Sequence, residues 1–305
     1  MSHWRGLSLV CPRCRGELLA RPPGAACRQC DAEYAEQEGV LDLVAGRRGA
    51  PGFDPHFFST LREVEDRHFW FVGRRQVVLS ALRRAVPDLA SRRLFDVGCG
   101  SGGLLSFLSR SGVRVAGACD VYPESLRLVR ARIDVPLVRV DEGRDPPLGP
   151  GHDLLGMFDV LEHIDDDVGA LRALREALRP GGALVLTVPA HPSLYDEMDE
   201  LACHRRRYRR ADLRRVIDQA GLEVRLISHF MSPLVPALAV VRWAGRVARF
   251  TRERAVERRE AEFRVIPGLN AAVRGVLALE RIVMRLTSLP FGSSIVAVAA
   301  RPDPS

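Results

Sequence analysis

The stretch that decides the fold is residues 94–103, which read Leu-Phe-Asp-Val-Gly-Cys-Gly-Ser-Gly-Gly. A short apolar run ends in a cluster of glycines, and apolar residues with helical spacing follow from Leu104 to Leu108. Glycine tolerates a positive φ and lets the backbone approach a ligand closely. The stretch therefore predicts a strand, a tight turn and a helix. The turn falls at the carboxyl end of a strand, where open α/β sheets bind ligands.

The glycine spacing by itself leaves the ligand open. Gly98-x-Gly100-x-Gly102 lacks the glycine that would complete the dinucleotide fingerprint, and no Gly-Lys-Ser/Thr ending follows, as a phosphate-binding loop would require. A turn with a purely structural role is the competing interpretation. The residues that follow the later strands decide between the two.

Length and composition bound the class of protein. The chain has 305 residues, of which 47% are hydrophobic, so it can bury a large core. It contains no apolar run near the ~18 residues of a membrane span, and its first residues lack the apolar core of a secretory signal. We therefore expect a cytoplasmic protein without a transmembrane segment. The net charge is +7 and every basic residue is arginine, which is weak support for a nucleic-acid partner.

Two cysteine pairs mark a small N-terminal module. Cys11-Pro-Arg-Cys14 and Cys27-Arg-Gln-Cys30 supply four thiolates at the spacing of tetrahedral zinc, and the module resembles a zinc ribbon. A redox pair or a chance arrangement is the alternative. Four thiolates leave no open position, so we expect the Zn²⁺ to be structural. Residues 34–43 are expected to form one closing strand.

Beyond a Gly/Pro/Arg-rich linker at residues 45–55, strands and helices alternate, which is typical of a parallel sheet wrapped by helices. We expect a zinc-ribbon module over residues 1–46, a linker and helical segment over 47–92, and an α/β domain over 93–305. A helical insertion over 231–289 precedes the last strand. The expected strands are 94–97, 113–118, 137–140, 153–158, 182–188, 223–229 and 293–300, and the expected helices are 72–86, 102–111, 123–133, 167–178 and 210–220.

Polar residues follow the successive strands. Asp120 ends the second strand of this domain, 22 residues after Gly98, where a carboxylate can accept both hydroxyls of a ribose. Asp141 follows the third strand and could accept from an adenine amine or cap a loop. Phe-Asp-Val-Leu-Glu-His, residues 158–163, follows the fourth strand, and Arg-Pro-Gly-Gly, residues 179–182, precedes the fifth.

Together these motifs resemble the class I S-adenosylmethionine-dependent methyltransferases, over about residues 65–301. The resemblance implies a Rossmann-like seven-stranded sheet with a reversed last hairpin, and S-adenosyl-L-methionine as cofactor. It implies that Gly98 and Gly100 pass under the methionine part, that Asp120 binds the ribose and that Asp141 lies near the adenine. The remaining residues that we expect at the cofactor are Trp70, Arg74, Asp96, Cys99, Val121, Phe158 and Asp159.

The flanks resemble a narrower subgroup of bacterial small-molecule methyltransferases, whose members act in glycan, lipid or natural-product pathways. The relevant segments are residues 65–75, residues 189–199 and His-x-Arg-Arg-Tyr at residues 204–208. The usual subgroup pattern has a glycine where this chain has Cys203. We expect His191, Tyr195, Arg207 and Tyr208 to contact the substrate.

Methyl transfer needs alignment of the reactants, exclusion of water and, for some acceptors, removal of a proton. Histidine is the natural base near neutral pH, so His163 and His204 are the candidate catalytic residues. His163 could equally be a structural residue after the fourth strand. We predict a methyltransferase that acts on a small molecule. An RNA base methyltransferase is the alternative, so a nucleic-acid partner stays open. The insertion is open to three roles: substrate lid, homodimer interface or membrane surface.

Overall fold

A computed structural model describes residue 4 and residues 6–44, 56–141, 146–248 and 263–303. The predicted linker at residues 45–55 lies outside this range. The first strands and helices are β1 (Leu18–Arg21), β2 (Gly24–Cys27), β3 (Glu33–Gln37), β4 (Val40–Asp42), α1 (His56–Val64), α2 (Phe69–Ala85), β5 (Arg93–Val97), α3 (Gly103–Arg110), β6 (Arg114–Asp120), α4 (Pro123–Arg130), β7 (Leu137–Arg139) and β8 (His152–Phe158). They are followed by the 3-10 helix η1 (Leu161–His163), α5 (Asp167–Ala177), β9 (Leu178–Pro189), η2 (Pro192–Leu194), α6 (Glu197–Leu201), α7 (Arg210–Gln219), β10 (Glu223–Phe230), η3 (Ser232–Leu234), α8 (Val235–Ala248), α10 (Pro267–Leu286) and β11 (Ser294–Ala300).

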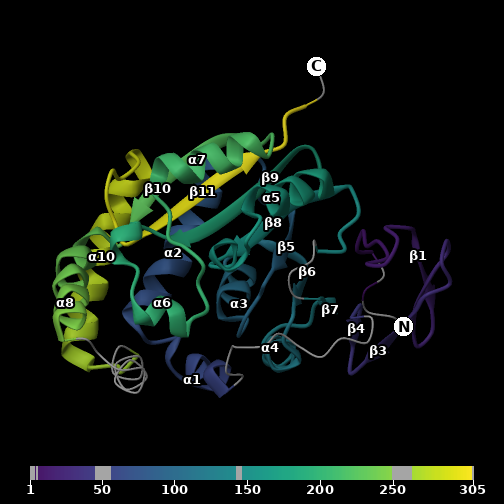
Figure 1. Cartoon of the computed structure of the whole chain (residues 1–305), viewed down its shortest axis with the longest axis horizontal. Helices are drawn as coiled ribbons and strands as arrows, with labels where there is room; N and C mark the ends of the chain where they lie inside the picture. The colour runs from purple at the N-terminus through teal and green to yellow at the C-terminus, as the bar shows by residue number, and fades with distance from the viewer. Residues whose placement is uncertain (1–3, 5, 45–55, 142–145, 249–262, 304–305) are drawn as a thin grey trace.

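The predicted α/β sheet is confirmed. Seven strands lie in the order β7-β6-β5-β8-β9-β11-β10 (Figure 1). The first five are parallel, and β11 runs antiparallel to both β9 and β10, which is the reversed hairpin implied by the resemblance. One boundary was wrong. β9 begins at Leu178 and not at 182, because Leu178 already pairs with His152 before the Pro180 turn.

Alternating side chains of the strands pack helices onto both faces of the sheet. In β5, Leu94 belongs to the apolar cluster that holds α2, α3 and α4, whereas its neighbour Phe95 belongs to the cluster that holds α5 and α7. Both side chains are fully buried. Strands buried on both faces read as continuous apolar runs, which is why this segment stood out in the sequence.

The N-terminal module is joined to the same sheet. β4 pairs in parallel with β7, so the four strands of the module extend the sheet at its β7 edge. The ion pair between Arg139 and Asp42 and the bond from the Leu43 amide to the Arg139 carbonyl reinforce this junction. The expectation of one closing strand over 34–43 was wrong. Glu38 and Gly39 both have positive φ, at 51° and 73°, and they turn the chain into the β3–β4 hairpin.

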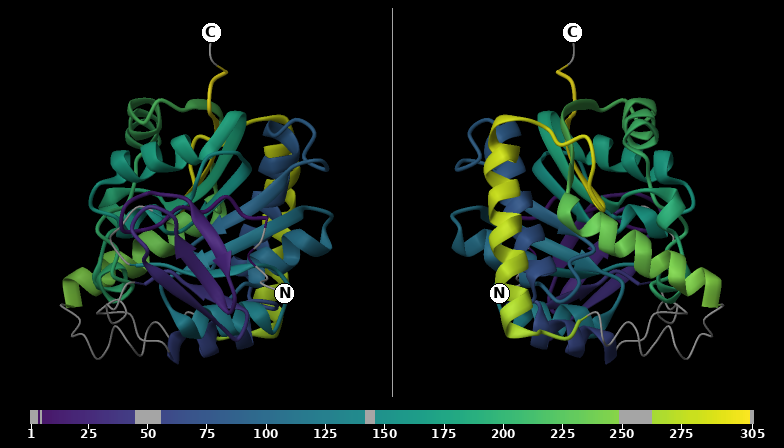
Figure 2. Two further views of the ribbon diagram at one scale, coloured as in Figure 1. Left: turned by 90° about the vertical axis from the view of Figure 1, so that its right-hand side faces the viewer. Right: turned by 90° about the vertical axis from the view of Figure 1, so that its left-hand side faces the viewer.

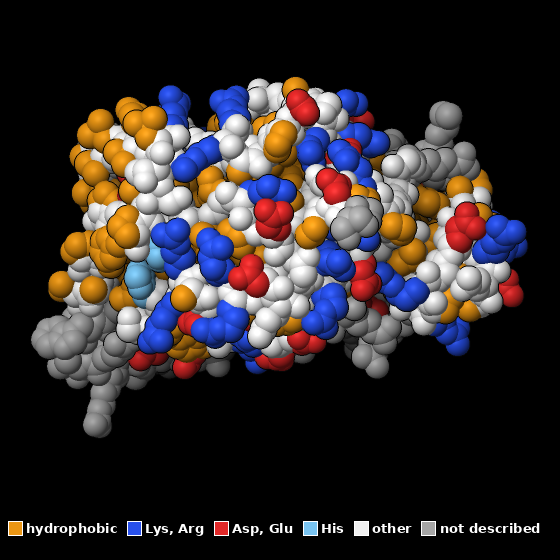
Figure 3. Space-filling model, turned by 90° about the horizontal axis from the view of Figure 1, so that it is seen from above, with side chains coloured by type: hydrophobic (Ala, Val, Ile, Leu, Met, Phe, Trp, Pro, Cys, Tyr) orange, Lys and Arg blue, Asp and Glu red, His pale blue; other side chains and the backbone are white. Residues whose placement is uncertain are grey.

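The insertion before the last strand is helical, as predicted, and α10 lies along α2 (Figure 2). Asn270 joins the two helices, since its side chain accepts from the Phe69 amide and donates to the Arg67 carbonyl. The outward side of α10 is apolar and exposed, and the hydrophobic side chains gather at that end of the molecule in Figure 3. Among the described residues, no helix is long and apolar enough to cross a membrane. Lid, dimer interface and membrane surface stay predictions for this segment.

Candidate active site

The glycine turn forms an open cradle at the end of β5. Gly98, Gly100 and Gly102 have φ of 79°, 53° and 76°, a region that favours glycine. The Gly98 amide donates to the carbonyl of Cys119 on the neighbouring strand. A Cβ at Gly98 would lie 2.5 Å from the Val160 side chain, whereas a Cβ at Gly100 would meet nothing within 4 Å. The backbone at Gly100 therefore faces free space that a ligand can fill.

Two buried carboxyl groups lie beside this cradle. Asp120 is held by the amides of Gly100 and Tyr122, at 2.8 and 3.0 Å. Asp96 Oδ1 is buried and has no hydrogen-bond partner among the described residues. Burial raises the pKa of Asp96 to about 7, because the charged form is poorly solvated there. An orphaned carboxyl oxygen next to a glycine cradle suits the ammonium group of a methionine moiety.

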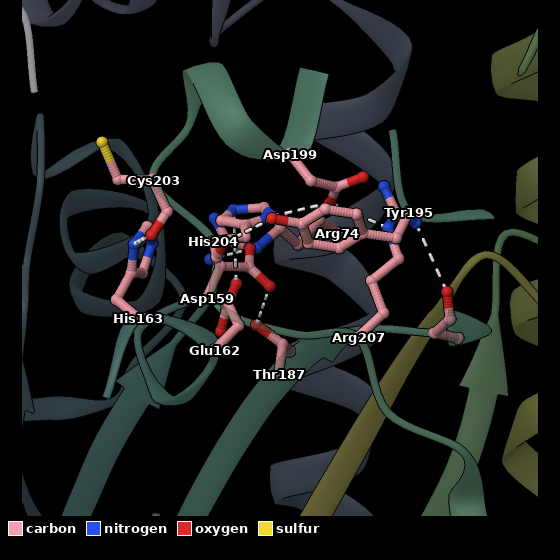
Figure 4. A network of polar contacts seen from close by, with 11 residues as sticks. Arg74, Asp159, Glu162, His163, Thr187, Tyr195, Asp199, Cys203, His204 and Arg207 are labelled. Atoms are coloured by element: carbon pink, nitrogen blue, oxygen red, sulfur yellow. Dashed lines mark hydrogen bonds and ion pairs between the residues drawn. The ribbon is translucent and has the colours of Figure 1, made fainter. Parts of the chain in front are cut away.

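The first turns of α2 reach the same edge of the sheet. The Arg74 guanidinium lies 5.3 Å from the ring centre of Trp70 and forms a 2.6 Å ion pair with Asp159. Asp159 also accepts from the Thr187 hydroxyl at 3.0 Å (Figure 4). The structure thus brings Trp70 and Arg74 to the end of β8, and their predicted contact with the cofactor stays a prediction.

Glu162 and two histidines converge just after β8. The imidazoles of His163 and His204 lie 4.9 Å apart, edge to face, and His204 Nε2 is 3.9 Å from Glu162 Oε1 (Figure 4). Burial lowers the pKa of His163 to about 4, so its ring is neutral at physiological pH. Burial also raises the pKa of Glu162 well above its usual range, and the neighbouring Asp159 adds to this.

The loop that carries His204 is held by one buried acid. Asp199 Oδ1 accepts from His204 Nδ1 and from Arg207 Nε, both at 2.8 Å, while Oδ2 accepts from the Asp196 amide. The Tyr195 hydroxyl donates to the His204 carbonyl at 2.8 Å. Arg207 and Tyr195, which we predicted as substrate contacts, thus also position His204.

The other predicted residues lie in different settings. Tyr208 is buried, and its hydroxyl donates to Asp167. The His191 ring stacks on His229, and its Nε2 is buried without a hydrogen-bond partner among the described residues. Asp141 follows β7 and is partly exposed. Cys99 and Phe158 are buried, and Val121 is half-buried after Asp120.

Cys203 adopts a left-handed backbone with φ of 60°. This conformation favours glycine, which is the residue that the subgroup pattern has at this position. The Cys203 carbonyl accepts from His163 Nδ1 at 3.1 Å, so the conformation of this turn helps to orient the His163 ring.

Sequence reasoning assigned no role to Glu65 or Glu162. Glu65 is buried, accepts from the Ser101 hydroxyl in the glycine turn and pairs with Arg132, so it ties the segment before α2 to the cradle. The sequence shows an acidic residue three positions before His68, but it does not show that this residue contacts Ser101 and Arg132, which are distant along the chain. Glu162 lay within the quoted motif, and only its burial beside two histidines reveals its importance.

The cysteines of the N-terminal module form a compact cluster. Their four sulfurs lie within 4.8 Å of one another. The amides of Arg13 and Gln29 donate to Cys11 and Cys27, at 3.4 Å each. Burial tends to raise the pKa of Cys11, but hydrogen bonds from Tyr34 and the backbone outweigh it and lower this pKa to about 6. Tetrahedral Zn²⁺ with bonds of about 2.3 Å fits such a cluster.

Comparisons with known proteins agree with this geometry. A family model described as "Methyltransferase domain" matches residues 71–227, about half of the chain. A ubiquinone biosynthesis O-methyltransferase of Xanthomonas oryzae is 33% identical over 107 residues, which cover 33% of this chain and 44% of the relative. One of Marinobacter nauticus is 29% identical over 117 residues, or 35% and 49% of the two chains. The match thus spans less than half of these curated relatives.

Solved structures share the fold. Phosphoethanolamine N-methyltransferase 2 of Haemonchus contortus has a TM-score of 0.53 at 16% identity, covering 83% of this chain and 59% of its own. A chain from the complex of the Haloferax volcanii Trm112 methyltransferase activator with a methyltransferase has a TM-score of 0.51 at 18% identity, covering 82% and 96%. Family match, motif geometry and fold agree, and the chain belongs to the methyltransferase-domain family as a class I S-adenosylmethionine-dependent methyltransferase.

Proposed function

We propose that this enzyme methylates an oxygen of a small hydroxyl-bearing acceptor from a lipid, glycan or natural-product pathway. The observation that carries the proposal is the pair of imidazoles, His163 and His204, at the carboxyl edge of β8 beside the glycine cradle. An acceptor hydroxyl must lose its proton to become a good nucleophile, whereas a neutral amine already carries a nucleophilic lone pair. The relatives named as O-methyltransferases support the same reaction.

The donor site follows from the cradle. When bound, S-adenosylmethionine supplies a methyl group already activated on its sulfonium. The Gly98 and Gly100 backbone admits the methionine part, and Asp96 offers its free carboxyl oxygen to the ammonium. Asp120 Oδ1 keeps acceptor capacity for the ribose, because it accepts the Tyr122 amide and has a further lone pair, whereas Oδ2 accepts from the Gly100 amide and from Cys99 Sγ. We assign supporting contacts to Trp70, Arg74, Cys99, Val121, Asp141, Phe158 and Asp159.

At the acceptor, the proton goes to a positioned imidazole. Asp199 and the Cys203 carbonyl only accept hydrogen bonds, so Nδ1 is the donor in both histidines. In the neutral form of either ring, Nε2 then carries a free lone pair. We assign proton removal to His204 Nε2. The acceptor oxygen forms a bond to the methyl carbon, the carbon–sulfur bond breaks, and its electron pair stays on sulfur.

The acceptor loop supplies the remaining contacts. We propose that His191 offers its unpartnered Nε2 to the acceptor. Arg207, Tyr195 and Tyr208 fix the loop through Asp199, the His204 carbonyl and Asp167. Their side chains therefore position the acceptor site, and their effect on substrate binding acts through the shape of this loop.

In the N-terminal module, we propose that Cys11, Cys14, Cys27 and Cys30 hold a structural Zn²⁺. Two sulfurs accept backbone amides at the spacing typical of zinc knuckles, and four thiolates complete a tetrahedron. The pairing of β4 with β7 makes this module a support for the strand that precedes Asp141.

The direct test incubates the full chain with methyl-labelled S-adenosylmethionine and two sets of acceptors. One set holds phenolic and alcoholic compounds with and without a lipid tail, and the other holds transfer and ribosomal RNA. We expect label only in the first set, on oxygen, as mass spectrometry would show. Label in RNA alone would establish the alternative, an RNA base methyltransferase, and would overturn the proposal.

A further inference from the structure

Three potential metal ligands converge at the acceptor edge. One ligand atom each from Glu162, His163 and His204 lies within 4.8 Å of the other two. His204 approaches the carboxylate directly, with Nε2 3.9 Å from Glu162 Oε1. A metal bound to imidazole and carboxylate at about 2.0–2.2 Å requires only a modest contraction of this triangle.

Each histidine is already oriented as a metal ligand requires. In metal sites the nitrogen that does not bind the ion usually donates to a carboxylate or carbonyl, which fixes the tautomer. His204 Nδ1 donates to Asp199, and His163 Nδ1 donates to the Cys203 carbonyl. Asp199 is in turn held by Arg207 and the Asp196 amide. The supporting contacts use Nδ1 of each ring and leave both Nε2 atoms available as ligands.

Glu162 supplies an independent indication of a cation site. Its side chain is fully buried, yet neither carboxyl oxygen has a hydrogen-bond partner among the described residues. The nearby guanidinium groups are used elsewhere, since Arg74 pairs with Asp159 and Arg207 pairs with Asp199. Buried carboxylates are usually paired or bound to a metal.

We propose that Glu162, His163 and His204 bind a divalent cation that holds the acceptor oxygen during methyl transfer, an inference that rests on the proposed O-methylation. Three protein ligands leave coordination positions open, as in catalytic sites and unlike the four-sulfur cluster. Two imidazoles and one carboxylate suit Zn²⁺, Mn²⁺, Fe²⁺ or Co²⁺ better than Ca²⁺ or Mg²⁺.

With the cation bound, His204 changes from base to ligand, because an Nε2 atom bound to the ion has no lone pair left for a proton. A hydroxyl bound to the ion is acidified, so its proton passes to solvent and not to the imidazole. The oxygen then bonds to the methyl carbon while the carbon–sulfur bond breaks and leaves its electron pair on sulfur. The two histidines become ligands, and Asp199 becomes a positioning residue for one of them.

Manganese is the probe that separates this site from the cysteines, because Mn²⁺ prefers oxygen and nitrogen ligands to thiolates. The full chain, with its thiolate cluster loaded with zinc, is titrated with MnCl₂ and followed by electron paramagnetic resonance. We expect one bound Mn²⁺ per chain in the wild type. Glu162→Gln should weaken binding at least tenfold, and Asp199→Asn should weaken it roughly 10–100-fold as a supporting residue.

The control is Glu200→Gln, which removes an exposed carboxylate from the same segment and should leave the affinity unchanged. Glu162→Gln removes an unpaired buried carboxyl group, so its melting temperature should not fall, and a loss of Mn²⁺ cannot then be ascribed to unfolding. A wild type that binds no Mn²⁺ at millimolar concentration, or a Glu162→Gln variant that binds it equally well, would overturn the cation site.

Methyl transfer is measured in parallel on protein dialysed against EDTA, with the zinc content of the cysteine cluster checked. Loss of transfer that MnCl₂ restores supports the cation site. Full transfer without added metal, together with no Mn²⁺ binding, assigns the proton to His204 and leaves O-methylation intact. Mn²⁺ binding that depends on Glu162 but no label on any oxygen would instead overturn the proposed function alone.

Discussion

Among the described residues, two clusters of side chains could bind a metal ion, and they differ in the number of coordination positions that they leave open. The four cysteines of the N-terminal module can saturate a tetrahedral ion. Glu162, His163 and His204 offer three ligands at the edge of the sheet where we propose that substrates bind, so positions remain for an acceptor. We therefore infer a structural role for the first cluster and a catalytic role for the second. The number of ligands and their place in the fold thus separate a structural role from a catalytic one.

The largest effect is expected from removing one ligand of the four-cysteine cluster. Cys27→Ser removes a buried thiolate, and we expect loss of zinc and more than ~5 kcal/mol of the stability of the module, because metal binding and folding are coupled in such small units. Zinc content and thermal unfolding measure this. Cys203→Ser is the matched control and should retain the zinc. Unchanged zinc content in Cys27→Ser would contradict the assignment.

The second prediction concerns the raised pKa of Asp96, the buried carboxyl group beside the glycine cradle. Its pKa is about 7 in the folded chain and about 4 when unfolded. Between these values the folded state retains a proton that the unfolded state has released, so stability falls as the pH rises. The change from pH 4 to pH 8 is at most ~4 kcal/mol.

Asp96→Asn should abolish this part of the pH dependence and become more stable than the wild type above pH 7. Denaturant unfolding of the free enzyme at several pH values measures it. Asp218→Asn, which alters an exposed carboxylate on α7, should keep the wild-type slope. Parallel stability curves for wild type and Asp96→Asn would show that the buried carboxyl group titrates normally.

A substitution at Asp120 tests whether S-adenosylmethionine binds in the glycine cradle, near the cluster of Glu162, His163 and His204. Asp120→Ala removes two charge-assisted acceptors at the cradle, and we expect S-adenosylhomocysteine to bind roughly 100-fold more weakly by calorimetry. Asp141→Ala, at a partly exposed position after β7, should cost only a few-fold. A larger loss for Asp141→Ala would place the nucleoside contacts differently.

The smallest effect concerns the turn beside His163. Cys203→Gly removes the strain of a left-handed backbone at φ of 60° and should stabilise the protein by about 1 kcal/mol, since only glycine adopts this region freely. Thermal unfolding measures the gain, and Cys203→Ala should show none. Destabilisation by the glycine would mean that the thiol itself contributes to the loop.

Local patterns predicted much of this molecule. The strand and glycine turn at residues 94–103, the acid at Asp120 and the two cysteine pairs depend on residues close in sequence, and the structure places them as expected. The boundary of β9 and the hairpin at Glu38 and Gly39 were missed because both depend on pairing partners. Positive φ at a glutamate is not visible from residue type alone.

Long-range contacts account for the rest. The pairing of β4 with β7 joins segments about a hundred residues apart, and the sequence of neither strand indicates which strand it pairs with. Glu162 carries no signal in the sequence beyond its acidic side chain. It becomes significant only when the fold buries it without a partner beside His204, which is 42 residues further along the chain.

The most direct test of the account is a crystal structure of the full chain with S-adenosylhomocysteine and MnCl₂, using anomalous scattering to locate manganese. We expect an ion about 2.0–2.2 Å from the Nε2 atoms of His163 and His204 and from a Glu162 oxygen. The sulfur of the cofactor product should lie at the same edge, over Gly98 and Gly100. Manganese absent from this cluster, or a cofactor bound elsewhere on the sheet, would contradict the account.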